Sequence, residues 1–284
     1  MNTTKYTLLI PLIALFCSTS ELFAGDRDFT YTYQSFVEPK NHRELELWFT
    51  YLQTGDELSF TSLSHRAEFE IGLGHKLQTS LYLNLDYASF INDQFAVIDP
   101  QTGLATSSNY LQKDFSMSVS SEWKWQITDP VANAIGTALY GEFTLGPDVR
   151  GIEGKLIFDK KVGNLIAALN VVGELETTSE LESTYFAEGV VVNNVLWKKE
   201  KVLELNLGLA YDFSEAFSAG IELFNASEFE DGEMENALYG GPSLSYKGEE
   251  WWATLTAMPL LMAGEQGELD YRPLETRLIL AFDL

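Results

Sequence analysis

The chain repeats an alternation of apolar and polar residues with a period of two. In one stretch the first set is Leu77, Thr79, Leu81, Leu83, Leu85 and Tyr87, and the set between is Gln78, Ser80, Tyr82, Asn84 and Asp86. A β-strand points successive side chains to opposite faces, whereas a helix would scatter these residues around its circumference. The stretch therefore predicts a strand with one apolar and one polar face.

The same alternation along the chain predicts twelve strands. They span 42–52, 62–74, 77–89, 113–128, 134–146, 151–161, 165–176, 191–213, 217–225, 236–247, 250–259 and 271–284. Short turns alternate with connections that are mostly longer, such as 90–112 and 177–190, which is typical of a transmembrane barrel with short periplasmic turns. Ten or fourteen strands stay open as alternatives, because residues 177–201 lack a clear pattern.

Charges of both signs recur on the polar faces, as at Arg66 with Glu68 and at Glu122 with Lys124. An enclosed polar lumen explains such mixing, with the apolar faces turned to lipid. The alternative is a soluble sandwich or a lipocalin-like barrel, in which the apolar face points into a core. We predict an all-β fold, namely a closed antiparallel transmembrane β-barrel of about twelve strands over residues 42–284.

The first residues have the features of a secretory signal peptide. Lys5 precedes an apolar run over 8–16, which is too short for the ~20 residues of a membrane-spanning helix. We predict a signal peptide over 1–24, with cleavage after Ala24 or, alternatively, after Ser20, and a periplasmic N-terminal segment over 25–41. The single cysteine, Cys17, falls within the removed part, so the mature chain can form no disulfide.

Charge and motifs limit the partners. Without residues 1–24 the chain has 17 basic and 41 acidic side chains and keeps its net charge of −24, which excludes nucleic acid. No Walker loop, dinucleotide fingerprint, zinc spacing or haem motif occurs, so we predict no cofactor and no metal site. The expected partners are outer-membrane lipids, lipopolysaccharide and, during biogenesis, the barrel-assembly machinery.

One acidic segment leaves an alternative open. It contains Glu228, Glu230, Asp231, Glu233 and Glu235. Its hard oxygen ligands suit Ca²⁺ or a divalent bridge to lipopolysaccharide. The segment lacks the spacing of an EF-hand, and a solvated acidic loop is the favoured interpretation.

The chain ends in a further alternation, formed by Leu278, Leu280, Phe282 and Leu284. This ending resembles the C-terminal signal by which outer-membrane proteins are handed to the barrel-assembly machinery. That signal usually ends in Phe, whereas here the aromatic residue stands two positions before the last one. The resemblance implies location in a bacterial outer membrane.

A longer resemblance covers residues 39–84. Its motifs are Pro39-Lys40, Glu44-Leu45-Glu46-Leu47-Trp48, Arg66 with Glu68-Phe69-Glu70, Gly72-Leu73-Gly74, Leu77-Gln78 and Leu81-Tyr82-Leu83-Asn84. Together they resemble the opening of an uncharacterised family of proteobacterial outer-membrane barrels. Such proteins are often described as transporter-like or porin-like without a demonstrated substrate. The resemblance therefore implies a fold and a location rather than an activity.

The predicted function is a passive channel or small-solute porin with a net acidic lumen. The predicted lumenal residues are Glu46, Arg66, Glu68, Glu70, Glu122, Lys124, Glu275 and Arg277. The close carboxylates among them are interpreted as a salt-bridge network with Arg66. Two alternatives are a closed structural or surface-binding barrel that acts through its loops, and an outer-membrane hydrolase.

The hydrolase is the least favoured of these, and we predict that the chain is not an enzyme. Only three histidines are present. Ser64 adjoins His65, and neighbours on a strand point to opposite faces, so they cannot act as a nucleophile and its base.

Overall fold

The computed structural model describes residues 26–53, 61–92, 96–98, 105–107, 110–187, 190–230, 233–264 and 273–284. The predicted signal peptide, 1–24, lies outside these ranges. Among the described residues, no helix has the length and hydropathy needed to cross a membrane.

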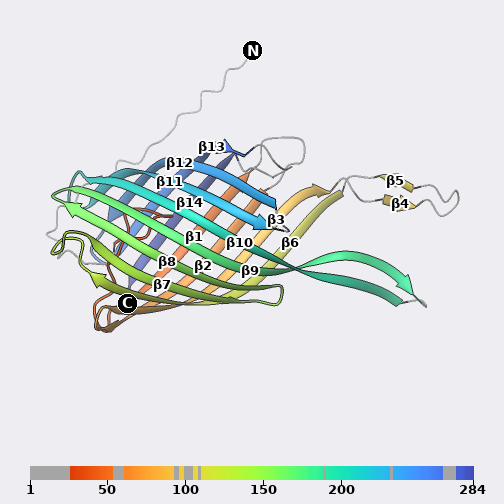
Figure 1. Ribbon diagram of the computed structural model, residues 1–284, viewed down its shortest axis with the longest axis horizontal. Helices are drawn as coiled ribbons and strands as arrows, with labels where there is room; N and C mark the ends of the chain where they lie inside the picture. The colour runs from red at the N-terminus through yellow and green to blue at the C-terminus, as the bar shows by residue number, and fades with distance from the viewer. Residues whose placement is uncertain are drawn as a thin grey trace, which may run out of the picture.

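Twelve antiparallel strands form one closed barrel (Figure 1). They are β1 (Arg43–Gln53), β2 (Thr61–Gly74), β3 (Leu77–Asn92), β6 (Tyr110–Thr128), β7 (Gly136–Leu145), β8 (Val149–Val162), β9 (Leu165–Ala187), β10 (Val190–Asp212), β11 (Phe217–Glu230), β12 (Glu233–Lys247), β13 (Trp251–Ala263) and β14 (Leu274–Asp283). Two short strands, β4 (Ala96–Ile98) and β5 (Ala105–Ser107), pair separately between β3 and β6.

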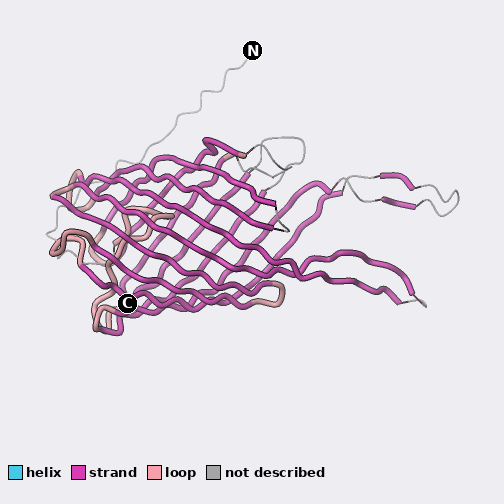
Figure 2. Tube along the Cα trace, in the orientation of Figure 1, coloured by secondary structure: helices cyan, strands magenta, loops and turns pink. Residues whose placement is uncertain are grey.

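The barrel closes where β1 pairs with β14, over a register that runs from Glu44 opposite Asp283 to Gln53 opposite Leu274. All the remaining barrel strands pair with the strands that precede and follow them in the chain. The exception is that β3 pairs with β6, because β4 and β5 form a separate sheet between them. In Figure 2 the described chain is strand joined by loops. Closure leaves the barrel with no free strand edge, and it confirms the predicted fold and the count of twelve.

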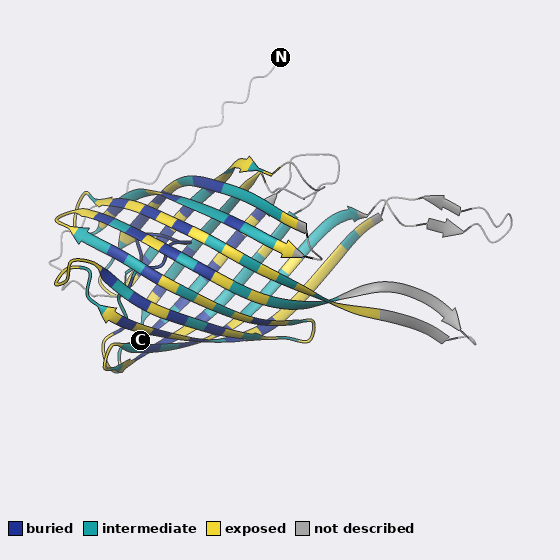
Figure 3. Ribbon diagram, viewed as in Figure 1, coloured by how far each residue is buried: buried dark blue, intermediate teal, exposed yellow. Residues whose placement is uncertain are grey.

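The outer surface of the barrel is apolar and its inner surface is polar. On β6, Phe115 is 67% exposed, whereas Glu122 on the opposite face is 1% exposed. The same alternation appears along most strands in Figure 3. A soluble barrel would bury the apolar face instead. The burial pattern thus confirms the predicted orientation of the two faces.

The connections agree with the predicted division between the two ends of the barrel only in part. Both barrel termini lie at the end that has the turn between β2 and β3, and the longest connection, between β3 and β6, lies at the opposite end. At that opposite end, however, β9 and β10 extend until only two residues separate them, as do β11 and β12. At Gly163, which connects β8 to β9, the backbone has a φ of 59°. Glycine adopts this left-handed conformation without a steric penalty, and it suits a two-residue hairpin turn.

The opposite end differs from the prediction at two hairpins. The acidic segment that contains Glu228 and Glu235 was expected to be a solvated loop, but β11 continues to Glu230 and β12 starts at Glu233, so that Glu228 pairs opposite Glu235. Residues 177–190 were expected to form a loop, but β9 continues to Ala187 and β10 starts at Val190, with pairing up to that point. The resulting hairpin projects beyond the rest of the barrel in Figure 1. Two antiparallel strands can pair through their backbone hydrogen bonds even where no further strand flanks them. The pairing of β9 with β10 therefore extends beyond the part of the sequence in which apolar and polar residues alternate.

The N-terminal segment also differs from the prediction. Residues 25–41 were predicted to form a periplasmic N-terminal segment. The described residues up to Glu38 instead run inside the barrel, where Phe29, Thr30 and Ser35 have no exposed surface, and the next two residues, Pro39 and Lys40, are exposed. The segment has no regular strand structure, and period-two reasoning had no means of placing it. We call residues 26–40 the plug.

Candidate functional site

The barrel interior has two halves. The half near the short turns contains the plug, and the half near the long hairpins contains a cavity of about 830 Å³. Tyr31 and Tyr33 of the plug line this cavity. The plug therefore forms its floor.

Glu222 of β11 is the main anchor of the plug. Its carboxylate accepts hydrogen bonds from the backbone nitrogens of Thr30, Tyr31 and Thr32 at 2.9, 2.8 and 2.9 Å. The Thr256 hydroxyl donates to the same carboxylate at 2.7 Å. Glu222 is fully buried, and charge-assisted hydrogen bonds of this kind are stronger than neutral ones. The carboxylate thus fixes the middle of the plug to the wall.

Neutral side chains of the wall hold the plug on either side of this point. Asn170 of β9 accepts a hydrogen bond from the Tyr33 nitrogen at 2.6 Å and donates to the Tyr33 carbonyl at 2.8 Å. The hydroxyls of Ser245 and Thr254 both donate to the Arg27 carbonyl. These bonds satisfy backbone groups of the plug that are shielded from water.

Phe29 supplies the apolar contact of the plug. It packs with three small or branched side chains of β9 and β10, Ile166, Ala168 and Ala210. A Cβ atom at Gly208 would lie 2.8 Å from carbons of the Phe29 ring. The absence of a side chain at Gly208 therefore makes room for Phe29.

Charged groups hold the start of the plug. Lys247 lies 3.3 Å from a carboxylate oxygen of Asp28, which also accepts a hydrogen bond from Ser218. Burial raises the pKa of Asp26 from 3.8 to about 6, against the opposing attraction of Lys247. The ionised form of Asp26 is thus disfavoured where it lies.

The floor of the cavity combines aromatic rings with cations. The Arg277 guanidinium lies 3.9 Å from the centre of the Tyr31 ring, and the Lys155 ammonium lies 4.1 Å from that of Tyr33. The Tyr31 hydroxyl donates to Glu275 at 2.5 Å. Cation–π contacts of this type attract more strongly where water is excluded.

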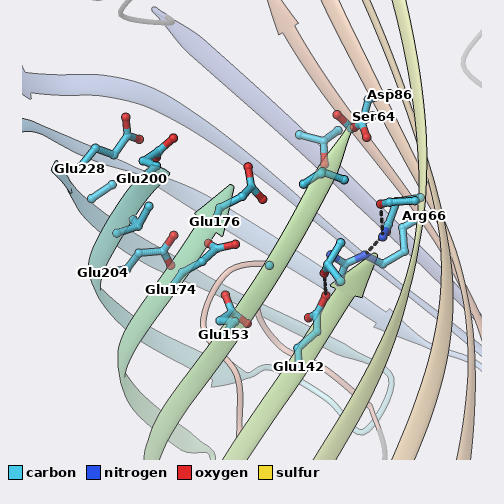
Figure 4. Close-up of a pocket in the computed structure, with 18 of the residues that line it drawn as sticks. Ser64, Arg66, Asp86, Glu142, Glu153, Glu174, Glu176, Glu200, Glu204 and Glu228 are labelled. Atoms are coloured by element: carbon cyan, nitrogen blue, oxygen red, sulfur yellow. Dashed lines mark hydrogen bonds between the residues drawn. The ribbon is translucent and has the colours of Figure 1, made fainter. Parts of the chain in front are cut away.

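The cavity wall is strongly acidic. It carries eleven carboxylates against three basic side chains. The carboxylates are Asp86, Glu142, Asp148, Glu153, Glu174, Glu176, Glu200, Glu204, Glu228, Glu235 and Glu275, and the basic groups are Arg66, Lys155 and Arg277. Figure 4 shows Glu153, Glu174, Glu176, Glu200, Glu204 and Glu228 gathered on one side and Arg66 opposite.

Strand register places several of these acids side by side. Glu142 of β7 lies opposite Glu153 of β8, which lies opposite Glu174 of β9. Like charges in such pairs repel each other. The carboxylates of the wall thus form a row across three neighbouring strands.

All eight predicted lumenal residues lie on the inward face of their strands. Six have even numbers, whereas Glu275 and Arg277 have odd numbers, which is the inward parity of β14. Arg66, Glu275 and Arg277 line the cavity. The other five are buried in the plugged half: Glu46, Glu68, Glu70, Glu122 and Lys124. Whether any of them controls conduction stays a prediction.

The carboxylates expected to pair with Arg66 have a different cation beside them. The cation beside Glu46 is Arg27 of the plug, at 3.5 Å. Arg66 instead donates a hydrogen bond to Asn84 and stacks on the rings of Trp48 and Tyr82. The sequence offered no signal for Arg27, because a residue outside the strands has no predictable register.

The predicted assembly signal lies on β14, except for Leu284, which follows the end of that strand. Its Phe282 is 38% exposed on the outer surface and Leu284 is 68% exposed, whereas the intervening Ile279 and Ala281 are buried. Recognition of this strand by the assembly machinery stays a prediction.

Ser64 and His65 lie on opposite faces of β2, as expected. Both residues border the cavity, but the His65 ring lies 4.7 Å from the ring of Phe49, which is exposed on the outside of the barrel. The Nδ1 atom of His65 is hydrogen-bonded to the carbonyl of Trp48 rather than to Ser64. The two side chains therefore do not form a catalytic pair.

Solved structures with a similar fold are outer-membrane barrels. The COG4313 outer membrane channel from Pseudomonas putida F1 matches with a TM-score of 0.57 and 12% identity, covering 88% of this chain and 98% of that one. The β domain of the Bordetella autotransporter BrkA matches with a TM-score of 0.50 and 11% identity, over 87% and 100% of the two chains. At such identities the likeness concerns the fold alone.

Among curated proteins, none shows significant sequence similarity to this chain. A family profile, in contrast, covers most of it, from residue 21 to residue 277. This span includes the plug and all of β1 to β13, together with the first residues of β14. The chain belongs to DUF6662, a family of unknown function.

Proposed function

We propose that this protein is a cation-preferring channel of the bacterial outer membrane whose lumen is closed near the short turns by its own N-terminal segment. The observation that carries the proposal is the acidic cavity, with eleven carboxylates and three basic groups, above the plug. Small cationic solutes enter the cavity from the side of the long hairpins. Passage through the barrel then requires the plug to shift.

Membrane insertion is supported by the outer surface. Its exposed side chains include Leu205 and, beside the short turns, aromatic residues such as Phe213, Tyr246 and Trp251. Aromatic residues near the ends of an apolar band match the interfacial belts of transmembrane barrels.

Two matched substitutions test insertion. Leu205→Arg introduces a charge on the outward face of β10, and we expect it to lower the free energy of unfolding in lipid vesicles by about 2–4 kcal/mol. Val131→Arg, in the turn after β6 and 68% exposed, serves as the control and should cost less than about 1 kcal/mol. Equal effects of the two changes would count against a lipid-facing β10.

Conductance in planar bilayers tests the channel. With the plug docked, we expect the intact protein to conduct weakly. Removal of residues 27–38 should open a pore with a preference for cations over anions. A double variant, Glu153→Gln with Glu174→Gln, should reduce that preference, whereas Glu249→Gln, outside the cavity, should leave it unchanged.

A second candidate function is a closed structural or surface-binding barrel. The hydrogen bonds that fix the plug to Glu222 and Asn170 favour it, as does the hairpin of β9 and β10 that projects beyond the barrel. Absence of conductance after removal of residues 27–38, from a barrel that still folds, would reject the channel in favour of this candidate. A clear anion preference would also reject the cation channel.

A further inference from the structure

Three carboxylates meet in the plugged half of the barrel, outside the acidic cavity. They belong to Glu46 of β1 and to Glu68 and Glu70 of β2, which are 1%, 1% and 7% exposed. Glu46 lies directly opposite Glu68 in the strand register. One oxygen from each of the three side chains lies within 4.8 Å of the other two. Like charges placed this way destabilise a sheet unless something neutralises them.

Glu68 differs from the other two carboxylates because no donor group forms a hydrogen bond to it among the described residues. Glu46 accepts a hydrogen bond from the Trp48 indole at 2.6 Å, and Glu70 accepts one from the Gln78 amide at 2.6 Å. Neither carboxylate oxygen of Glu68 has a hydrogen-bond partner among the described residues. Buried polar atoms in folded proteins are nearly always satisfied. The oxygens of Glu68 therefore require either a proton shared with the neighbouring Glu70 carboxyl or a bound cation.

The charge around these groups leaves room for a divalent cation. Arg27 lies 3.5 Å from Glu46, so the three carboxylates and this guanidinium have a formal net charge of −2. Arg66 lies on the same face of β2 as Glu68 and Glu70, but its guanidinium contacts Asn84 and the rings of Trp48 and Tyr82. One divalent ion balances the remaining charge.

The spacing suits calcium. Ca²⁺ binds oxygen ligands at about 2.3–2.6 Å, so two of its ligands can lie up to roughly 5 Å apart. The 4.8 Å limit on the carboxylate oxygens falls within this distance. Glu44 also has one oxygen without a hydrogen bond, and it lies opposite Glu70 in the register. We propose that Glu46, Glu68 and Glu70 bind one Ca²⁺ ion that joins β1 to β2 beside Arg27 of the plug.

Metal content after refolding tests this site, because a buried ion enters most readily while the barrel folds. The full mature chain is refolded in detergent with CaCl₂ or with EDTA, then desalted and analysed for calcium by mass spectrometry. We expect one retained Ca²⁺ per chain and a higher unfolding temperature in the calcium sample. Glu68→Gln should reduce the affinity at least roughly tenfold, as loss of even a supporting group at a metal site does.

Two further variants make the result specific. Glu174→Gln removes a carboxylate of the cavity wall and should leave the retained calcium unchanged. Glu68→Asp keeps the charge and covers the case in which Glu68→Gln fails to fold; it should bind calcium more weakly than the native chain.

Terbium provides a second readout, since the Trp48 indole lies next to the site. Tb³⁺ bound there should luminesce on tryptophan excitation, and Ca²⁺ should displace it. Failure of the native chain to retain calcium would overturn the proposal and indicate that protons hold the carboxylates together. Equal loss in Glu68→Gln and Glu174→Gln would also overturn it, because binding would then reflect general attraction to an acidic lumen.

Discussion

The two halves of the barrel interior are built on the same twelve strands and the same alternation, yet one is filled and the other is hollow. In the plugged half, groups of the wall have partners in the plug: Glu222 accepts hydrogen bonds from its backbone, Asn170 bonds Tyr33, and Gly208 makes room for Phe29. In the cavity the same strands present long carboxylates, as at Glu174 and Glu204. The difference teaches that alternation decides which residues face inward, while the hydrogen bonds and packing that the plug makes with individual side chains decide which half of the interior is filled.

The largest expected effect comes from Glu222, which anchors the plug. Glu222→Gln replaces a carboxylate that accepts three backbone hydrogen bonds through its two oxygens with an amide that keeps one acceptor oxygen and turns an NH₂ donor toward the remaining backbone N–H. Hydrogen bonds to charged groups contribute about 1.5–3 kcal/mol each. We expect cleavage by chymotrypsin after Phe29, Tyr31 or Tyr33 to become faster by at least roughly tenfold, as measured by mass spectrometry.

Glu228→Gln is the matched control, because Glu228 lies on the same strand and lines the cavity. Its cleavage rate should equal that of the native chain. If both variants were cleaved equally fast, Glu222 would not be the anchor that distinguishes the plugged half.

A smaller effect is expected from the glycine beneath Phe29. Gly208→Ala places a Cβ atom 2.8 Å from the Phe29 ring, and overpacking of this kind costs about 1–3 kcal/mol. Chymotrypsin cleavage should therefore rise, but by less than in Glu222→Gln. Gly173→Ala, where an added Cβ meets nothing within 4 Å, should change nothing. Tolerance of Gly208→Ala would mean that Phe29 does not pack there.

The smallest effect concerns the protonation of Asp26. Because its pKa is raised from 3.8 to about 6 in the docked plug, docking is favoured when the carboxyl is neutral and weakens as the pH rises through this range. Asp26→Asn removes that penalty, so we expect slower cleavage than in the native chain at neutral pH. Asp129→Asn, in an exposed turn, is the control. Faster cleavage of Asp26→Asn would show that its charge helps docking through Lys247.

Much of the barrel could be predicted from the sequence, because a closed sheet between lipid and an enclosed interior imposes a strict period of two. The alternation in β3, β6 and β10 gave the correct faces. It also identified Arg66 and Glu122 as lumenal residues. Strand ends at the long hairpins were less predictable, since β9 and β10 continue to pair where no barrel wall constrains the sequence pattern.

The plug could not be predicted by the same reasoning. Residues 26–40 have no repeating pattern, and their position depends on single partners far away in the sequence, such as Glu222 and Asn170. Both residues have the inward parity of their strands, but parity does not reveal whether an inward acid meets solvent, an ion or a backbone nitrogen. Only the three-dimensional arrangement separates Glu222, which holds the plug, from Glu228, which lines the cavity.

Accessibility to a thiol reagent tests the division of the interior most directly. The only native cysteine is Cys17, within the predicted signal peptide, so single cysteines can be placed at Ser64 in the cavity and at Ser243, which is fully buried in the plugged half. With the protein in lipid vesicles and a small cationic methanethiosulfonate reagent, we expect rapid modification of Ser64→Cys and protection of Ser243→Cys. Equal modification of the two would contradict a plug that closes one half of the lumen.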